Sequence, residues 1–171
     1  MRSRNIKKPP ASVLVIWLVL AMGCGERKVS WFYSSLAEAK TAKDGPRSWV
    51  PEDLLPSSSR NIRIVGELSP SREWCSFDFS PGDGTIFEEH LNPVVTLPRS
   101  LSDVPSPNVA WWPAPLEGKL AVDKLHNSGY RLFMLERSAS SASAAVALIA
   151  VDPLSGHAFV YETYNSHSLG N

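Results

Sequence analysis

The chain has 171 residues, of which 43% are hydrophobic and 20% charged, with 17 basic and 17 acidic side chains. This length suits one globular domain with a buried core. Four of the basic residues lie among the first ten, so the rest of the chain is mildly acidic and lacks the Lys and Arg clusters of nucleic-acid-binding proteins. The two cysteines, Cys24 and Cys75, are too few for a disulfide framework or a cysteine metal site.

Residues 1–23 have the pattern of a signal peptide. A basic stretch precedes an uncharged, apolar run from Ala11 to Met22. This run is shorter than the roughly 20 residues that a helix needs to cross a bilayer. It ends in Leu20-Ala21-Met22-Gly23-Cys24, which resembles the bacterial lipobox, with Ala21 and Met22 differing from its most usual residues. We therefore expect residues 1–23 to be removed.

The resemblance to the lipobox implies that Cys24 becomes the N-terminus and carries a diacylglycerol thioether and an N-acyl chain such as palmitate. Two acyl chains anchor a protein stably, whereas one gives only marginal membrane binding. Residues 24–30 are then a polar tether. Gly25 in place of Asp favours, by resemblance to Gram-negative lipoproteins, the outer membrane and its periplasmic side. The alternative is a secreted protein that is cleaved nearby, with Cys24 free or disulfide-bonded.

Residues 31–164 are expected to form one α+β domain that begins with a helix. Trp31-Phe32-Tyr33 leads into residues 35–43, where Ser35 and Glu38 have the spacing of a capping box. Asp44-Gly45-Pro46 ends this helix. Prolines at positions 51 and 56 then exclude a regular helix or a central strand, so this segment is expected to be an ordered loop.

This N-terminal part of the domain carries a second recognisable pattern. Its members are Tyr33 with the helix after it, then Trp49-Val50-Pro51, Leu55-Pro56, Ser58 and Ile62. The pattern resembles a segment of small uncharacterised bacterial lipoproteins and envelope proteins. This chain departs from it at Ser48, where Gly is usual, and at Ser59, where Ala is usual. The resemblance implies a place in the cell envelope and no particular activity.

Five segments predict an antiparallel sheet. In the first, Ile62 and Ile64 alternate with Arg63 and Val65, the period of a half-buried strand. The predicted strands are 61–68 and 73–79, which form a hairpin, and 130–137, 144–151 and 157–164, which form a three-strand meander. The alanines of 144–151 also allow a helix, but its β-branched residues and the turn after it favour a strand.

Two further short helices are expected between the hairpin and the meander. One covers residues 85–91, and the other runs from Leu116 to Leu125, where Leu116, Leu120 and Leu125 share a helical face. The proline-rich connection over residues 93–115 is long for a compact domain, and such loops are usually functional or mobile. Residues 165–171 are expected to be a flexible tail.

Sequence motifs for catalysis and metal binding are missing. The chain has no Gly-rich phosphate loop, Gly-x-Ser-x-Gly elbow or His-Glu-x-x-His. Glu88-Glu89-His90 brings three metal-ligand residue types together, but the side chains of adjacent helical residues point in different directions. We therefore interpret the trio as a solvated face and expect no metal or cofactor.

Cys75 with His157 and Asp152 is a conceivable thiol triad. A catalytic thiol must be exposed, however, and the alternation with Phe77 predicts that Cys75 is buried and inert. We assign no catalytic residue.

Three tryptophans are the candidate partner surface: Trp49, Trp111 and Trp112. They lie in proline-rich loops, where restrained φ angles leave little backbone entropy to lose on binding. The alternative is that they cover the open side of the sheet. Because adjacent side chains rarely both face inward, one of Trp111 and Trp112 should be partly exposed.

The expected function is that of a lipid-anchored, non-enzymatic module of the cell envelope that binds an envelope protein or organises the envelope. The alternative is a small envelope hydrolase whose site the sequence does not identify. A pocket that gathers His, Asp, Glu or Cys within mutual reach would distinguish the two.

Overall fold

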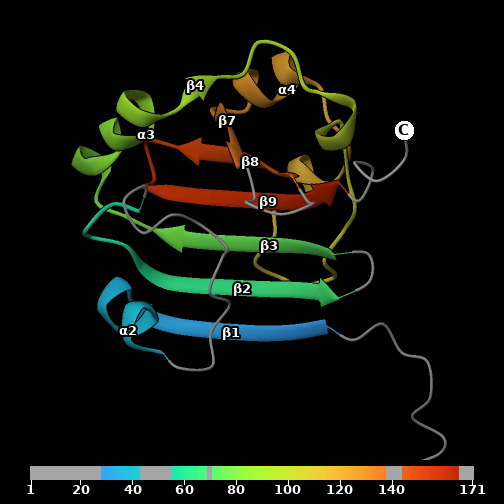
Figure 1. The fold of residues 1–171 in the computed structure, drawn as a ribbon. Coiled ribbons are helices and arrows are strands. Elements are labelled where there is room, and N and C mark those ends of the chain that lie inside the picture. Colours follow the sequence, from blue (N-terminus) through green and yellow to red (C-terminus); the bar gives the residue numbers. More distant parts are fainter. Residues whose placement is uncertain (1–27, 43–54, 69–70, 138–143, 166–171) are drawn as a thin grey trace, which may run out of the picture.

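The computed structural model describes residues 28–42, 55–68, 71–137 and 144–165 (Figure 1). Its main feature is a seven-stranded antiparallel sheet in the order β1-β2-β3-β9-β8-β7-β4, beside a small two-stranded sheet of β5 and β6. The predicted signal peptide, Cys24, Trp49 and residues 166–171 lie outside the described residues, so the statements about them stay predictions. Among the described residues, none of the helices is long and apolar enough to cross a membrane.

Along the described chain, the long strands of the N-terminal and C-terminal parts are separated by short helices and two-residue strands. The strands are β1 (Lys28–Ser35), β2 (Arg60–Leu68), β3 (Ser71–Asp78), β4 (Asn92–Pro93), β5 (Asp103–Val104), β6 (Gly118–Lys119), β7 (Arg131–Arg137), β8 (Ala144–Asp152) and β9 (His157–Asn165). The α-helices are α2 (Leu36–Thr41), α3 (Thr85–His90) and α4 (Val122–Asn127), with 3₁₀ turns at Pro81–Asp83, Arg99–Leu101 and Ala114–Leu116. The predicted α+β class is therefore confirmed, with a larger sheet than expected.

Both predicted groups of strands are present. β2 and β3 form the hairpin, and β7, β8 and β9 form the meander. Residues 144–151 are a strand because β8 pairs with a neighbour on each side. What the sequence did not predict is the antiparallel pairing of β3 with β9, in which Trp74 faces Tyr161. This pairing joins the two groups into one sheet.

The edge strand β1 corrects the predicted start of the domain. Lys28 to Ser35 pair with β2, although residues 28–30 were expected in the tether and Trp31-Phe32-Tyr33 in a lead-in. The alternation that identifies a strand is hidden here, because Phe32 is 57% exposed although it is apolar, while Tyr33 is buried. At the opposite edge, β4 adds a short pairing with β7 that was not predicted either.

The helix predictions are right in part. Ser35 caps α2 as expected, its hydroxyl accepting from the Glu38 N–H at 3.3 Å. The Glu38 carboxylate accepts from the N–H of Ser34 at 2.7 Å, where a standard capping box would use Ser35. The helix expected from Leu116 is wrong, since α4 begins at Val122. Gly118 has φ +68, which a right-handed helix excludes, and it pairs with β5 instead.

Each face of the sheet carries its own apolar layer. On the first face, Phe77, Phe79 and Phe87 pack around Cys75, which is 2% exposed. Burial raises the pKa of the Cys75 thiol well above its usual range, and the charge of Glu73 raises it further. The prediction that Cys75 is buried is thus confirmed.

The proline-rich connection covers the second face. Leu101 and Trp112 of this segment, with Leu116 directly after it, pack against a layer that includes Trp74 and Tyr161 of the sheet. The indole N–H of Trp74 donates to the carbonyl of Pro105 at 3.0 Å, which fixes the connection to the sheet. This segment is therefore an ordered structural layer.

Candidate functional site

An aspartate and a histidine meet where β3 ends and β9 begins. Asp78 and His157 are partners in the register of these two strands, and Asp78 Oδ1 lies 2.6 Å from His157 Nδ1. A carboxylate on Nδ1 orients the imidazole ring and leaves Nε2 on the side away from the carboxylate. No described residue forms a hydrogen bond to that nitrogen, so the Asp78–His157 pair presents it to a further partner.

A β-bulge in β2 fixes the other oxygen of Asp78. The register of β2 against β3 shifts between Arg60 and Arg63, and Asn61 adopts φ +51. In this conformation Asn61 Nδ2 donates to Asp78 Oδ2 at 2.7 Å. A left-handed residue other than Gly costs of the order of 1–3 kcal/mol, and such strain and bulges concentrate at functional sites. Both carboxylate oxygens of Asp78 are therefore held in place.

Asp152 flanks His157 from the other side, as its partner in β8. Its carboxylate accepts from the backbone of Leu154 and Ser155 and from the Ser155 hydroxyl, at 3.1, 3.2 and 2.6 Å. Burial acts to raise the pKa of Asp152, but these hydrogen bonds and the nearby His157 outweigh it, and the net pKa is lowered. Asp152 thus holds the β8–β9 turn, while Asp78 holds the imidazole.

A cavity of about 210 Å³ adjoins the pair. It is lined by Arg63, Ser76, Phe77, Asp78, Trp111, His157 and Phe159, and we call it the Asp78–His157 pocket. Arg63 of β2, Ser76 of β3 and Phe159 of β9 are successive neighbours across the sheet, and Trp111 reaches the cavity from the proline-rich connection. The Trp112 ring packs edge-on against both Trp111 and Phe159. Strand register therefore brings charged, polar and aromatic groups into one cavity.

Two hydrogen-bond donors of this pocket lack partners among the described residues. Ser76 is 4% exposed, yet its hydroxyl has no partner in the described part of the chain. Arg63 is half-buried and forms no ion pair with any described residue. Buried polar groups in folded proteins are almost always hydrogen-bonded. The unmatched Ser76 hydroxyl, with the half-buried Arg63 guanidinium beside it, makes this pocket the candidate ligand site.

The structure places the two described candidate tryptophans, Trp111 and Trp112, in different environments. Trp112 is 6% exposed and donates its indole N–H to the carbonyl of Leu116 at 3.3 Å, so it belongs to the core. Trp111 is half-buried in the pocket wall, in keeping with the expectation that one of the two is partly exposed. The candidate partner surface thus narrows to Trp111 among the described residues.

The conceivable thiol triad is not assembled. Cys75 pairs with Val160 on the first face, whereas His157 lies with Phe159 on the second face, so the sheet separates thiol and imidazole. The partner of His157 is Asp78, which the sequence did not single out. In the sequence, Asp78 stood out only as a polar residue on the face of the predicted strand opposite Cys75 and Phe77.

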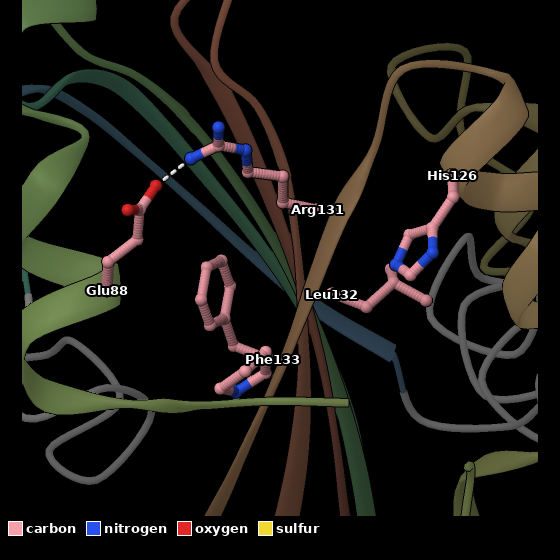
Figure 2. Close-up of a pocket in the computed structure, with 6 residues that line it drawn as sticks. Glu88, His126, Arg131, Leu132 and Phe133 are labelled. Carbon is pink, nitrogen blue, oxygen red and sulfur yellow. Dashed lines mark ion pairs between the residues drawn. The ribbon is translucent and has the colours of Figure 1, made fainter. Parts of the chain in front are cut away.

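A second, larger cavity of about 370 Å³ lies between α3 and α4 at the β7 edge (Figure 2). Its lining residues are Glu88, Pro93, His126, Arg131, Leu132 and Phe133, and we call it the Glu88–Arg131 pocket. Figure 2 shows the Arg131 guanidinium turned toward Glu88, with which it forms an ion pair. Both side chains are at least half exposed, and their charges are already matched. This pocket therefore carries a weaker indication of a ligand.

Metal ligands are not gathered in the described residues, where no three His, Cys, Asp or Glu side chains could hold an ion together. Glu88, Glu89 and His90 are all exposed on α3.

Comparison with known proteins finds no matching family, no matching curated protein and no matching solved structure. The chemistry of the site therefore carries the functional conclusion.

Proposed function

We propose that this protein is a lipid-anchored module of the cell envelope that binds a ligand in the Asp78–His157 pocket. The observation that carries the proposal is the set of unmatched donors, Arg63 and Ser76, beside the oriented imidazole of His157. Leaving a buried hydroxyl without a partner costs about 1–3 kcal/mol. A bound acceptor would recover this free energy, which favours binding over a purely structural role.

The anchor in this proposal is the lipid on Cys24, supported by the resemblance of residues 20–24 to a lipobox. The protein would lie outside the cytoplasm, on the periplasmic side of the outer membrane in a Gram-negative cell. Since β1 begins at Lys28, the chain between lipid and sheet spans at most about 14 Å. The β1 edge would therefore lie close to the membrane surface.

A small envelope hydrolase is the second candidate function, and the Asp78–His157 hydrogen bond is what favours it. A carboxylate that orients an imidazole is the arrangement of a general base. Ser76 lies two residues before Asp78 on the same face of β3 and could supply a hydroxyl nucleophile. Its hydroxyl forms no hydrogen bond with His157 or any other described residue, so the geometry supports binding better than catalysis.

The proposal is tested by purifying the full-length protein from its native membranes and measuring the masses of small molecules released from it. We expect a defined ligand from the wild type, and at least tenfold less from Trp111→Ala. Phe32→Ala, which removes an exposed aromatic ring outside the pocket, is the matched control and should retain the ligand. A ligand that Trp111→Ala retains in full contradicts the proposal. If the protein instead cleaves the ligand, and Ser76→Ala does not, the hydrolase is the correct function.

A further inference from the structure

We infer that the ligand of the Asp78–His157 pocket presents a carboxylate, with the Arg63 guanidinium and the Ser76 hydroxyl as its anchors. This inference rests on the proposed function and names its ligand class. Arg63 and Ser76 are register partners on adjacent strands, so both groups reach the cavity from the same row of the sheet.

The hydrogen-bond donors and acceptors of the pocket determine which hydrogen-bonding groups the ligand must present. Arg63 offers only donors, and the Ser76 hydroxyl and the Trp111 indole N–H can each donate one hydrogen bond. None of these three groups has an acceptor among the described residues. The one carboxylate of the lining, that of Asp78, is already engaged by His157 and Asn61. The atoms that a ligand brings to these donors must therefore be acceptors.

The charge of Arg63 makes an anionic acceptor the best match. A guanidinium that is partly withdrawn from water gains most from an opposite charge, and its planar fork matches a carboxylate in two parallel hydrogen bonds. The charged and titratable groups around the cavity are Arg63 of β2, Asp78 of β3, His157 of β9 and Asp152 of β8, with the exposed Arg60 opposite Asp78 in the register of β2 and β3. Two of these five groups are acids, and they disfavour a doubly charged phosphate relative to a singly charged anion. A singly charged carboxylate fits this balance.

The cavity also limits the size and shape of the ligand. Its volume of about 210 Å³ lies below the roughly 300–1,000 Å³ of sites for drug-sized molecules. The site therefore holds a small acid or the acidic end of a larger molecule. Trp111 and Phe159 form an apolar wall, against which a flat body can pack.

The test is calorimetric titration of the full mature chain with sodium benzoate, sodium acetate, benzamide and inorganic phosphate at constant ionic strength. Benzoate should bind at least tenfold more tightly than benzamide, its neutral counterpart, and more tightly than phosphate. Arg63→Gln and Ser76→Ala should each weaken benzoate binding, Arg63→Gln by tenfold or more, because a lost hydrogen bond to a charged group is worth about that factor. Arg131→Gln alters the Glu88–Arg131 pocket and should leave the affinity unchanged.

Several results would overturn the inference. These are equal binding of benzoate and benzamide, tighter binding of phosphate, failure of both carboxylates to bind, and full benzoate affinity in an Arg63→Gln variant. Thermal unfolding of each variant shows whether it is folded, and Ser76→Ala provides a second, smaller change. If the carboxylates fail while the native protein still carries a ligand that depends on Trp111, the ligand class is wrong and the proposed function stands. If no ligand depends on Trp111, both are wrong.

Discussion

Asn61 holds the site from a strained conformation, and this strain can be measured. Asn61→Ala removes the hydrogen bond to Asp78 and keeps a β-carbon at φ +51, whereas Asn61→Gly removes the same hydrogen bond and relieves the strain. We expect Asn61→Ala to lower the free energy of unfolding by about 1–3 kcal/mol and Asn61→Gly to lower it by less. Urea unfolding of both variants measures the difference. Equal losses would show that the backbone conformation is not strained.

The Cys75 thiol gives the protein a pH dependence in the alkaline range. Its pKa is raised by burial and by Glu73, above an ordinary value of 9.0, so the unfolded chain loses this proton at a lower pH than the folded chain. The stabilising contribution is complete below pH 9 and is lost as pH rises, by up to about 1.4 kcal/mol per pH unit.

The measurement is urea unfolding between pH 8 and pH 10, below the range in which Tyr130 and Tyr161, whose pKa values are also raised from 10.0, add their own dependence. The wild type should lose stability over this range, and Cys75→Ala should lose clearly less. An alkylating reagent should label the native thiol only on unfolding. Rapid labelling of the native protein would refute the inert, buried thiol.

At the level of elements, the β8–β9 turn positions the histidine. Gly156 has φ +69, its carbonyl accepts from the Phe79 N–H at 2.7 Å, and a β-carbon on it would lie 2.3 Å from the Phe79 carbonyl oxygen. We expect Gly156→Ala to lower the free energy of unfolding by about 1–3 kcal/mol. Gly82→Ala is the matched control, because a β-carbon there meets nothing within 4 Å, and it should be nearly neutral. Similar losses in the two variants would mean that the turn is not constrained.

The sequence predicted which segments form strands better than it predicted which strands pair with each other. Alternation identified the hairpin, since a period of two reports which residues share a face, and apolar runs bounded by turn residues identified the meander. It could not identify β1, where the exposed Phe32 breaks the pattern. The helical spacing from Leu116 placed the start of α4 too early, because the pairing of Gly118 with β5 prevails over apolar spacing.

The site was beyond prediction for a related reason. Asp78 and His157 meet only through the pairing of β3 with β9, which is long-range in the sequence, and Asn61 reaches Asp78 through a β-bulge in the hairpin. Periodicity places a residue on a face but does not specify the opposite strand. Trp111 was identified as a candidate because it is a large aromatic residue in a proline-rich loop, a signal that needs no partner strand.

For the whole molecule, the lipid anchor is tested by partition between water and detergent. The full-length wild type should enter the detergent phase, because two or more acyl chains bind membranes stably. Cys24→Ser should move to the aqueous phase. Cys75→Ser is the control and should stay with the detergent, since Cys75 is buried in the core. Unchanged partition of Cys24→Ser would exclude lipidation at this residue.

The most direct test of the central claim, that the Asp78–His157 pocket binds a ligand, is to locate binding residue by residue. The mature chain carrying Cys24→Ser keeps every described residue and can be titrated, in nuclear magnetic resonance experiments, with the small molecules released from the native protein. We predict that chemical shifts change at Arg63, Ser76, Trp111 and His157. Signals of His126 and Arg131 in the Glu88–Arg131 pocket should stay unchanged. Changes confined to that second pocket, or saturating amounts of released ligand that alter neither set, would contradict the claim.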